Sequence, residues 1–300
     1  MPLVYDLASV DVIEFGVGRE TNDGIEFVAI PTDEDVKSAL RDMVQQTAEA
    51  ISKHEEVVFA PSEKYGPEEN VVTSTRGEYA GVLANLHTAE MLPMVANALS
   101  EPEHIFCYFA RLSNREGRRL TCVRRATQFK GILKSRLIQV ITDALKIVEE
   151  RTFKLDNDYD LLIDDDNIHI LRAAGFVVLS GIEQVIMGAV PRNIARLQEH
   201  LPFVDFTSIS VYASTHSRAA KVLASICSEN EANNVNRERL IATCNECGAE
   251  VIMDRDRIRP RPGKELDFLY VLDRRLFRVQ LIEGQIEQYQ AGSRRLVQGA

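Results

Sequence analysis

The chain has 300 residues, of which 45% are hydrophobic and 27% are charged, with 16 Gly and 10 Pro. This composition is typical of a globular protein with a sizeable core, and it excludes collagen-like and wholly disordered chains. The formal net charge is −10 at pH 7, which argues against a protein that binds a polyanion over its whole surface.

The compartment is predicted from what the sequence lacks. The longest apolar stretch, residues 173–190, contains Ser180, Glu183 and Gln184 and is therefore interpreted as core rather than as a membrane span of about 20 apolar residues. The first fifteen residues have no basic stretch ahead of an apolar run, as a secretory signal would. The five cysteines are odd in number and scattered, as expected of reduced thiols. We expect a cytoplasmic protein.

The N-terminal elements begin with two short strands at 11–18 and 25–31, joined by an Asn-Asp-Gly turn that predicts a hairpin. A helix is predicted from Thr32, with Asp35 completing a capping box. Its apolar residues recur at helical spacing, at Val36, Leu40, Met43, Val44, Ala48 and Ile51. A strand at 57–59 should follow, and the polar segment 61–76, with its two prolines, is interpreted as a loop.

The next elements lead to a basic hairpin. Residues 79–86 are interpreted as a strand or buried segment, and residues 88–100 as a helix bent near Pro93. Paired strands are predicted at 104–112 and 119–129, around the turn Asn114-Arg115-Glu116-Gly117. We place a domain boundary near residue 130, between an acidic α+β domain at 1–130, which ends in the basic hairpin, and a second α/β domain at 131–300.

The second half mixes strands and helices. Residues 137–148 fit either strands or a helix, and residues 151–171 fit strands with a turn at 164–167. An amphipathic helix interrupted at Pro191 is predicted over 180–201, and residues 207–228 should also be helical. The last fifty residues should form short strands and a final amphipathic stretch. The predicted fold class is therefore α/β (α+β), with mixed or antiparallel sheets, packed helices and two sub-domains.

The charge is unevenly distributed. Residues 1–100 hold 6 Lys and Arg against 18 Asp and Glu, whereas residues 101–136 hold nine basic residues against three acidic ones. Because screening limits each phosphate contact to about 10 Å, local charge decides whether DNA binds. The candidate DNA-binding residues are Arg111, Arg115, Arg118, Arg119, Arg124, Arg125, Lys130, Lys134 and Arg136, and a second basic patch comprises Arg255, Arg257, Arg259, Arg261 and Lys264. The alternative, that these arginines pair with the acidic first third, stays open.

Nothing in the basic segment indicates that base edges are read, so we expect phosphate contacts that weaken steeply with salt. Changing Arg115, Arg118 and Arg119 together to Glu is expected to abolish most binding to any duplex while leaving thermal stability nearly unchanged.

The sequence gives little support for a calcium site, a metal-dependent nuclease site or a zinc site. The run Asp156-x-Asp158-x-Asp160 lacks the Gly and Glu that a calcium loop needs at its sixth and twelfth positions. Asp160, Asp164 and Lys154 could form a metal-dependent nuclease site, but without a recognised spacing. Cys244 and Cys247 form a CxxC with no second ligand pair and are interpreted as incidental thiols. We expect no catalytic residue, metal or cofactor.

Two segments resemble the KwaB-like family of the bacterial Kiwa anti-phage system. They are Phe153–Leu171 followed by Gly175-Phe176, and Leu269–Leu276 ahead of Tyr289, Ser293, Arg294 and Arg295. The similarity covers about residues 130–300. These motifs are structural rather than catalytic, so the resemblance assigns no residue a chemical role.

The resemblance implies a defence protein that binds DNA without strong sequence preference and blocks phage DNA replication. It also implies self-association, as a dimer or higher oligomer, and recruitment to the inner membrane by a KwaA-like membrane protein. Two alternatives stay open: a metal-dependent nuclease acting on phage DNA, and a scaffold of a membrane-associated defence complex that does not bind DNA.

Overall fold

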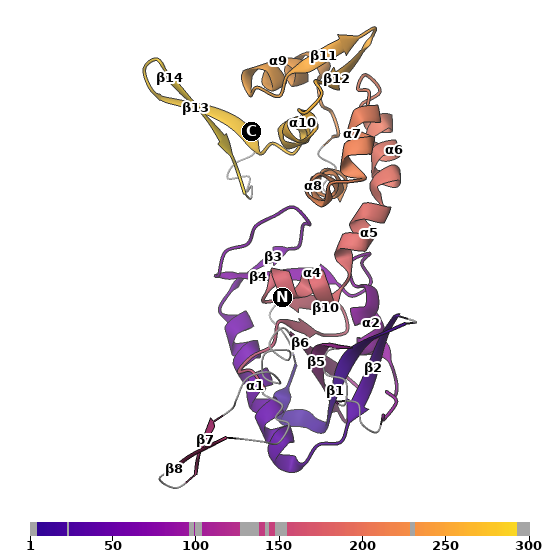
Figure 1. Cartoon of the computed structure of the whole chain (residues 1–300), viewed down its shortest axis with the longest axis vertical. Helices are drawn as coiled ribbons and strands as arrows, with labels where there is room; N and C mark the ends of the chain where they lie inside the picture. The colour runs from indigo at the N-terminus through magenta and orange to yellow at the C-terminus, as the bar shows by residue number, and fades with distance from the viewer. Residues whose placement is uncertain are drawn as a thin grey trace. The chain divides into compact units, whose positions relative to one another are not determined.

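The computed structural model describes residues 5–22, 24–95, 99, 104–126, 138–141, 144–147, 155–228 and 232–292. The chain forms two compact units, the first made of 1–58 and 67–182 and the second of 59–66 and 183–300. Figure 1 shows their elements. The fold is α/β with a mixed sheet, as predicted. The boundary predicted near residue 130 lies outside the described residues. Strand β6, which precedes residue 130, pairs with β9, which follows it further along the chain.

The first unit is built on an eight-stranded sheet with the order β2-β1-β5-β6-β9-β10-β4-β3. Its strands are β1 (Val10–Thr21), β2 (Gly24–Ile30), β3 (Glu55–Val58), β4 (Glu69–Ser74), β5 (Ile105–Asn114), β6 (Arg119–Arg125), β9 (Leu161–Ile163) and β10 (Asn167–Ile170). Only the β3–β4 pair is parallel. The predicted hairpins β1–β2 and β5–β6 are both confirmed.

The main core of this unit lies between the sheet and helix α1 (Glu34–Ser52). The predicted apolar face is confirmed, since Leu40, Met43, Val44 and Ile51 are buried against side chains of β1, β5 and β6. The predicted start was wrong. Asp33 is the N-cap, and its carboxylate accepts a hydrogen bond from the Val36 N–H at 2.9 Å, so the helix begins after Asp33 and not at Thr32.

The opposite face of β6 contacts α2 (Gly81–Thr88) and α4 (Ala173–Leu179). The segment predicted as a strand or buried segment is therefore helical, with Leu83 and Leu86 buried. The predicted helix at 88–100 is wrong where the structure describes it. Residues 89–95 are irregular, and the Pro93 carbonyl accepts a hydrogen bond from the Ala29 N–H of β2 at 2.9 Å. The Pro93 carbonyl, which in a helix would accept a hydrogen bond from within the helix, therefore accepts one from the edge strand β2 instead.

Two further segments differ from or refine the prediction. The predicted loop at 61–76 contains β4, whose residues Asn70 to Val72 are buried because β4 pairs with both β3 and β10. Proline and charged residues around this short run conceal its strand pattern. The ambiguous segment at 137–148 forms a hairpin of β7 (Ile138–Ile141) and β8 (Ala144–Ile147).

The second unit is mostly helical. Its elements are α5 (Ile182–Gly188), α6 (Val190–His200), α7 (Thr207–Ala213), α8 (Ser217–Ser228), α9 (Arg237–Glu246), α10 (Glu265–Leu272), and the hairpins β11 (Val251–Asp254)–β12 (Arg257–Pro260) and β13 (Leu276–Ile282)–β14 (Gln285–Gln290). Helix α8 is central, in contact with α6, α7 and α10. The predicted interruption at Pro191 is confirmed, because this proline lies in the first turn of α6. Among the described residues, no helix has the length and apolar character to cross a membrane.

Candidate nucleic-acid interface

The tip of the β5–β6 hairpin holds two exposed arginines. The turn is ordered by Asn114, whose Oδ1 accepts hydrogen bonds from the N–H groups of Glu116 (3.1 Å) and Arg118 (2.9 Å). Gly117 has a φ of 80°, which a residue with a side chain rarely adopts. The Arg115 and Arg118 side chains are 86% and 51% exposed. This tip is the most accessible part of the predicted DNA-binding segment that the structure describes.

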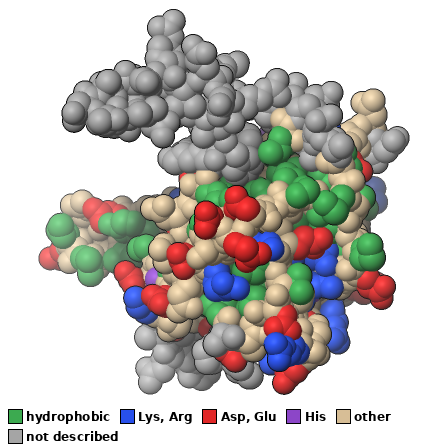
Figure 2. Space-filling model, turned by 90° about the horizontal axis from the view of Figure 1, so that it is seen from below, with side chains coloured by type: hydrophobic (Ala, Val, Ile, Leu, Met, Phe, Trp, Pro, Cys, Tyr) green, Lys and Arg blue, Asp and Glu red, His purple; other side chains and the backbone are tan. Residues whose placement is uncertain are grey.

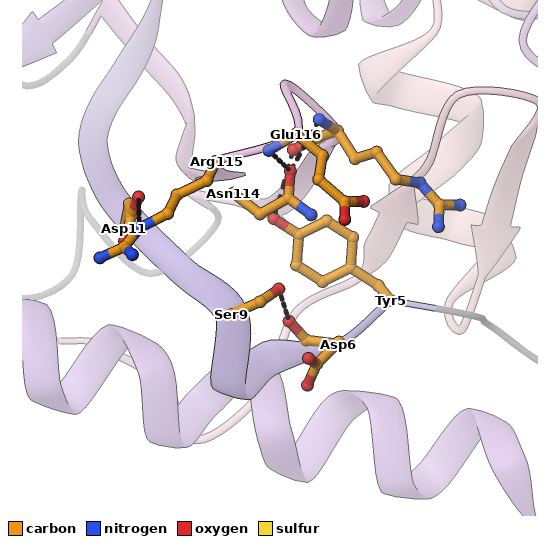
Figure 3. Close-up of a pocket in the computed structure, with 8 residues that line it drawn as sticks. Tyr5, Asp6, Ser9, Asp11, Asn114, Arg115 and Glu116 are labelled. Atoms are coloured by element: carbon orange, nitrogen blue, oxygen red, sulfur yellow. Dashed lines mark hydrogen bonds and ion pairs between the residues drawn. The ribbon is translucent and has the colours of Figure 1, made fainter.

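A cavity of about 570 Å³ lies beside this tip (Figure 3). It is lined by Tyr5, Asp6, Ser9, Asp11, Asn114, Arg115, Glu116 and Arg118. Arg115 points toward Asp11, with 2.8 Å between Nε and Oδ2. Burial raises the pKa of Tyr5 to about 12, so its hydroxyl stays neutral. Three carboxylates offset two guanidinium groups here, and the cavity therefore does not favour an anion.

Two of the predicted contacts, Arg111 and Arg119, instead fasten the C-terminal end of α2. Arg111 donates to the Ala89 carbonyl at 2.6 Å, and its Nε lies 3.2 Å from a Glu14 carboxylate oxygen. Arg119 donates to the carbonyls of His87 (2.6 Å) and Ala89 (2.7 Å). Cations are favourable at a helix C-terminus, where carbonyls lack partners. Changing Arg119 to Glu would break these bonds, so the expectation that the triple charge reversal leaves stability unchanged does not fit the structure.

Arg124 and Arg125 lie at a buried carboxylate. Arg124 is 3.0 Å from Asp156, 2.8 Å from Asp160 and 3.4 Å from Asp158. The backbone N–H of Arg125 donates to Asp160 at 2.7 Å. Asp156, Asp158 and Asp160, the run that was compared with a calcium loop, therefore surround the Arg124 guanidinium.

Asp164 closes the turn between β9 and β10. Its Oδ1 accepts hydrogen bonds from the N–H groups of Asp166 (2.9 Å) and Asn167 (2.7 Å), and its Oδ2 lies 3.3 Å from His169 Nε2. Burial alone would raise the pKa of Asp164, but these hydrogen bonds outweigh burial and lower it. Lys154 lies outside the described residues, among which no group of three or more His, Cys, Asp and Glu side chains is arranged to hold a metal ion.

The second basic patch occupies the β11–β12 hairpin and the residues after it. Arg257 and Arg259 alternate with buried Ile258 and Pro260, as strand geometry requires. Arg259 lies 4.0 Å from Asp254, Arg261 pairs with Glu250, and Lys264 lies 2.9 Å from Asp267. Arg255 and Arg257 are exposed and form no ion pair with a carboxylate in the described part of the chain.

The alternative that the arginines pair with the acidic first third holds for only some of them. Arg111 and Arg115 pair with Glu14 and Asp11 of the acidic first third, whereas Arg118 and Arg124 pair with aspartates of residues 156–165. Figure 2 shows acidic and basic side chains interspersed on the face that it presents. Lys130, Lys134 and Arg136 lie outside the described residues.

A second cavity, of about 440 Å³, lies wholly within the second unit. Its lining includes Lys64, Arg218, Lys221, Tyr270 and Arg275. Lys64, Arg218 and Lys221 were not singled out from the sequence, because Lys64 is far from the other two in the chain and none of the three lies in a basic run. Only the proximity of Arg218 and Lys221, three residues apart in a helical segment, gave a local signal.

The cysteines are predicted to be unreactive in the native protein. All five are free and buried, and Cys247 donates a hydrogen bond to the Leu276 carbonyl at 3.5 Å. Burial raises the pKa of Cys244 to about 12 and that of Cys227 to about 11, so almost no thiolate is present at pH 8. A thiol-specific disulfide reagent at pH 8 should therefore react slowly with folded protein and rapidly with all five thiols in denaturant. Rapid native labelling at Cys244 or Cys247 would contradict this.

The structure is that of an α/β protein with a mixed, mostly antiparallel sheet, arginine-rich hairpins and a mostly helical second unit. A family model described as Kiwa protein KwaB-like matches residues 105–281, which is more than half of the chain. The chain belongs to this KwaB-like family and is thus a protein of the Kiwa anti-phage defence system. The matched range begins at β5 and so includes the basic hairpin, which the resemblance seen in the sequence left out. Neither the curated proteins nor the solved structures contain a match.

Proposed function

We propose that this protein is a non-enzymatic cytoplasmic effector that binds duplex DNA through its phosphates, without strong sequence preference. It acts as a homo-oligomer with a membrane partner of the Kiwa system and blocks phage DNA replication. The observation that carries the DNA-binding step is the exposure of Arg115 and Arg118 at the ordered tip of β5–β6.

The ion pairs at this tip do not oppose the proposal. Exposed ion pairs contribute only about 0–1 kcal/mol, so a phosphate can replace Asp11 or Asp165 as the partner of these guanidinium groups at small cost. Arginine also presents a planar fork of donors that suits phosphate oxygens. The exposed pair Arg255 and Arg257 offers a second contact of the same kind in the other unit.

The proposal uses fewer arginines than the sequence suggested, because several of them are bound to groups of their own unit. Arg111, Arg119 and Arg124 hold carbonyls and carboxylates of their own unit, so they support the fold of the hairpin rather than contacting DNA. Arg115 and Arg118 remain as the contacts in the first unit. Restricting the test to these two avoids the destabilisation that changing Arg119 would cause.

The test is a gel shift with duplex DNA at several salt concentrations. Changing Arg115 and Arg118 together to Glu should weaken binding at least tenfold for any duplex sequence, and the log–log salt slope should fall by about 0.9 for each phosphate that the variant no longer neutralises. The matched control changes Arg41 and Arg239, which are exposed on helices α1 and α9, to Glu. This control alters the net charge equally and should bind nearly as the wild type does.

The alternatives make different predictions in the same experiment. Magnesium-dependent cutting of plasmid DNA would support the nuclease, and absence of any shift at low salt would support the scaffold. If changing Arg255 and Arg257 to Glu abolishes binding and changing Arg115 and Arg118 does not, the DNA contact is on the β11–β12 hairpin instead.

A further inference from the structure

Within the residues that the structure describes, the lining of the cavity in the second unit includes Lys64, Arg218, Lys221 and Arg275 but no carboxylate. Of these four, Arg275 alone pairs with carboxylates nearby, those of Glu63 and Asp273. Lys64 comes from the loop at 59–66, and Arg218 and Lys221 come from α8. None of the three forms an ion pair with a carboxylate among the described residues. In the two basic hairpins, by contrast, most of the described arginines have such a partner. Like charges that face one cavity repel each other, and an anion between them would relieve this repulsion.

The position of Arg218 and Lys221 in helix α8 makes the excess of positive charge less favourable. Arg218 and Lys221 are three residues apart and therefore lie on one face of the helix. They occupy its N-terminal part, where the helix dipole favours negative charge, and the first turn contains no acidic residue. Two cations at this end are unfavourable in the free protein and become favourable when an anion binds between them.

The walls of the cavity are held in place before any ligand arrives. Buried Arg275 donates to the carbonyls of Ser62 (2.8 Å) and Gly292 (2.9 Å), which belong to segments on the cavity lining. The Ser62 hydroxyl donates to Ser225 Oγ of α8 at 2.8 Å, which fastens the loop to the helix. These bonds tie the Lys64 loop both to α8 and to the end of β14.

Individual side chains are oriented as well. The Arg218 guanidinium lies 5.4 Å from the centroid of the Tyr270 ring, a distance at which a cation is attracted to the ring face. A Cβ atom on Gly292 would come within 3.0 Å of Lys64 Cδ, so the absence of a side chain there leaves room for the lysine stem. Buried Val222 and half-buried Pro61 add apolar surface to the lining.

We propose that this cavity binds a small phosphate-bearing anion, with Lys64, Arg218 and Lys221 as the phosphate ligands. The volume of about 440 Å³ lies within the range of small-molecule sites, so a phosphomonoester with an organic group of nucleoside size fits better than phosphate alone. The same chemistry is offered by a free nucleotide and by the terminal phosphate of a nucleic-acid strand. The site is distinct from the hairpins proposed to contact duplex DNA.

The experiment is calorimetric titration of the full-length protein with four probes: AMP, adenosine, and a short single-stranded oligonucleotide with either a 5′-phosphate or a 5′-hydroxyl. AMP or the 5′-phosphorylated strand should bind at one site per chain, and adenosine should not. Tighter binding of AMP identifies a free nucleotide as the source, and tighter binding of the phosphorylated strand identifies a strand terminus. Equal binding of the two oligonucleotides, without AMP binding, would overturn the proposal and leave general DNA binding intact.

Two variants assign the site. Lys221→Gln and Arg218→Gln should each weaken binding about tenfold or more, as expected when a charge-assisted hydrogen bond is removed. Arg239→Gln removes an exposed arginine of α9 outside the cavity and should bind as the wild type does. Because Arg218→Gln also removes the interaction with Tyr270, Lys221→Gln is the decisive variant, and its thermal midpoint should be unchanged. Wild-type affinity in Lys221→Gln and Arg218→Gln would overturn the assignment.

Discussion

Replacing Asp160 with asparagine should lower the free energy of unfolding by about 3 kcal/mol or more, because it removes one partner of a buried ion pair. The Asp160 side chain is only 5% exposed, and its oxygens lie 2.8 Å from Arg124 and 3.2 Å from Arg172. It also accepts the Arg125 N–H at 2.7 Å. Asparagine keeps the shape of the side chain but directs an NH₂ group toward donors, so at least one hydrogen bond becomes a repulsive contact.

Asp158→Asn is the matched control for this substitution. Asp158 contacts the same two arginines, at 3.4 Å and 2.6 Å, but its side chain is 38% exposed. Solvent screens such a pair, so we expect a loss of less than about 1 kcal/mol. Urea denaturation followed by far-UV circular dichroism measures both variants. Equal losses in the two would contradict the conclusion that burial makes Asp160 the essential member of the cluster.

The second large effect is expected at Arg275 in the other unit. Its side chain is 3% exposed, its Nε lies 2.6 Å from the fully buried Asp273, and it pairs with Glu63. Arg275→Met retains the apolar stem but leaves both carboxylates without this cation and removes the donors to Ser62 and Gly292. We expect a loss of about 3–5 kcal/mol in the free energy of unfolding.

Arg278→Met is the control, because Arg278 is exposed in the neighbouring strand and should change stability by no more than about 0.5 kcal/mol. A double variant tests the cause. If the buried charge of Asp273 accounts for the loss, adding Asp273→Asn to Arg275→Met should recover part of the stability. A further loss in the double variant would show that packing, rather than the uncompensated charge, dominates.

The elements that the sequence predicted are those whose signals are local. The turns after Thr21 and Asn114 each lie between apolar strands, and the helical spacing from Leu40 to Ile51 needs no distant partner to be recognised. The helices over 182–228 followed from the same periodicity, as did the break at Pro191. In contrast, β4 is a strand because β3 and β10 lie on either side of it, and its own residues carry a weak signal.

The residues of the candidate sites also fall into those that local sequence signals predict and those that only distant contacts explain. The concentration of arginines, and a turn that would expose Arg115 and Arg118, could be predicted from the sequence. The bonds from Arg111 and Arg119 to the end of α2, and the cavity that Lys64, Arg218 and Lys221 share, depend on contacts between distant parts of the chain. The physical reason is that a charged side chain is neutralised, buried or exposed according to the groups that folding brings within a few ångströms of it, and those groups come from distant parts of the chain.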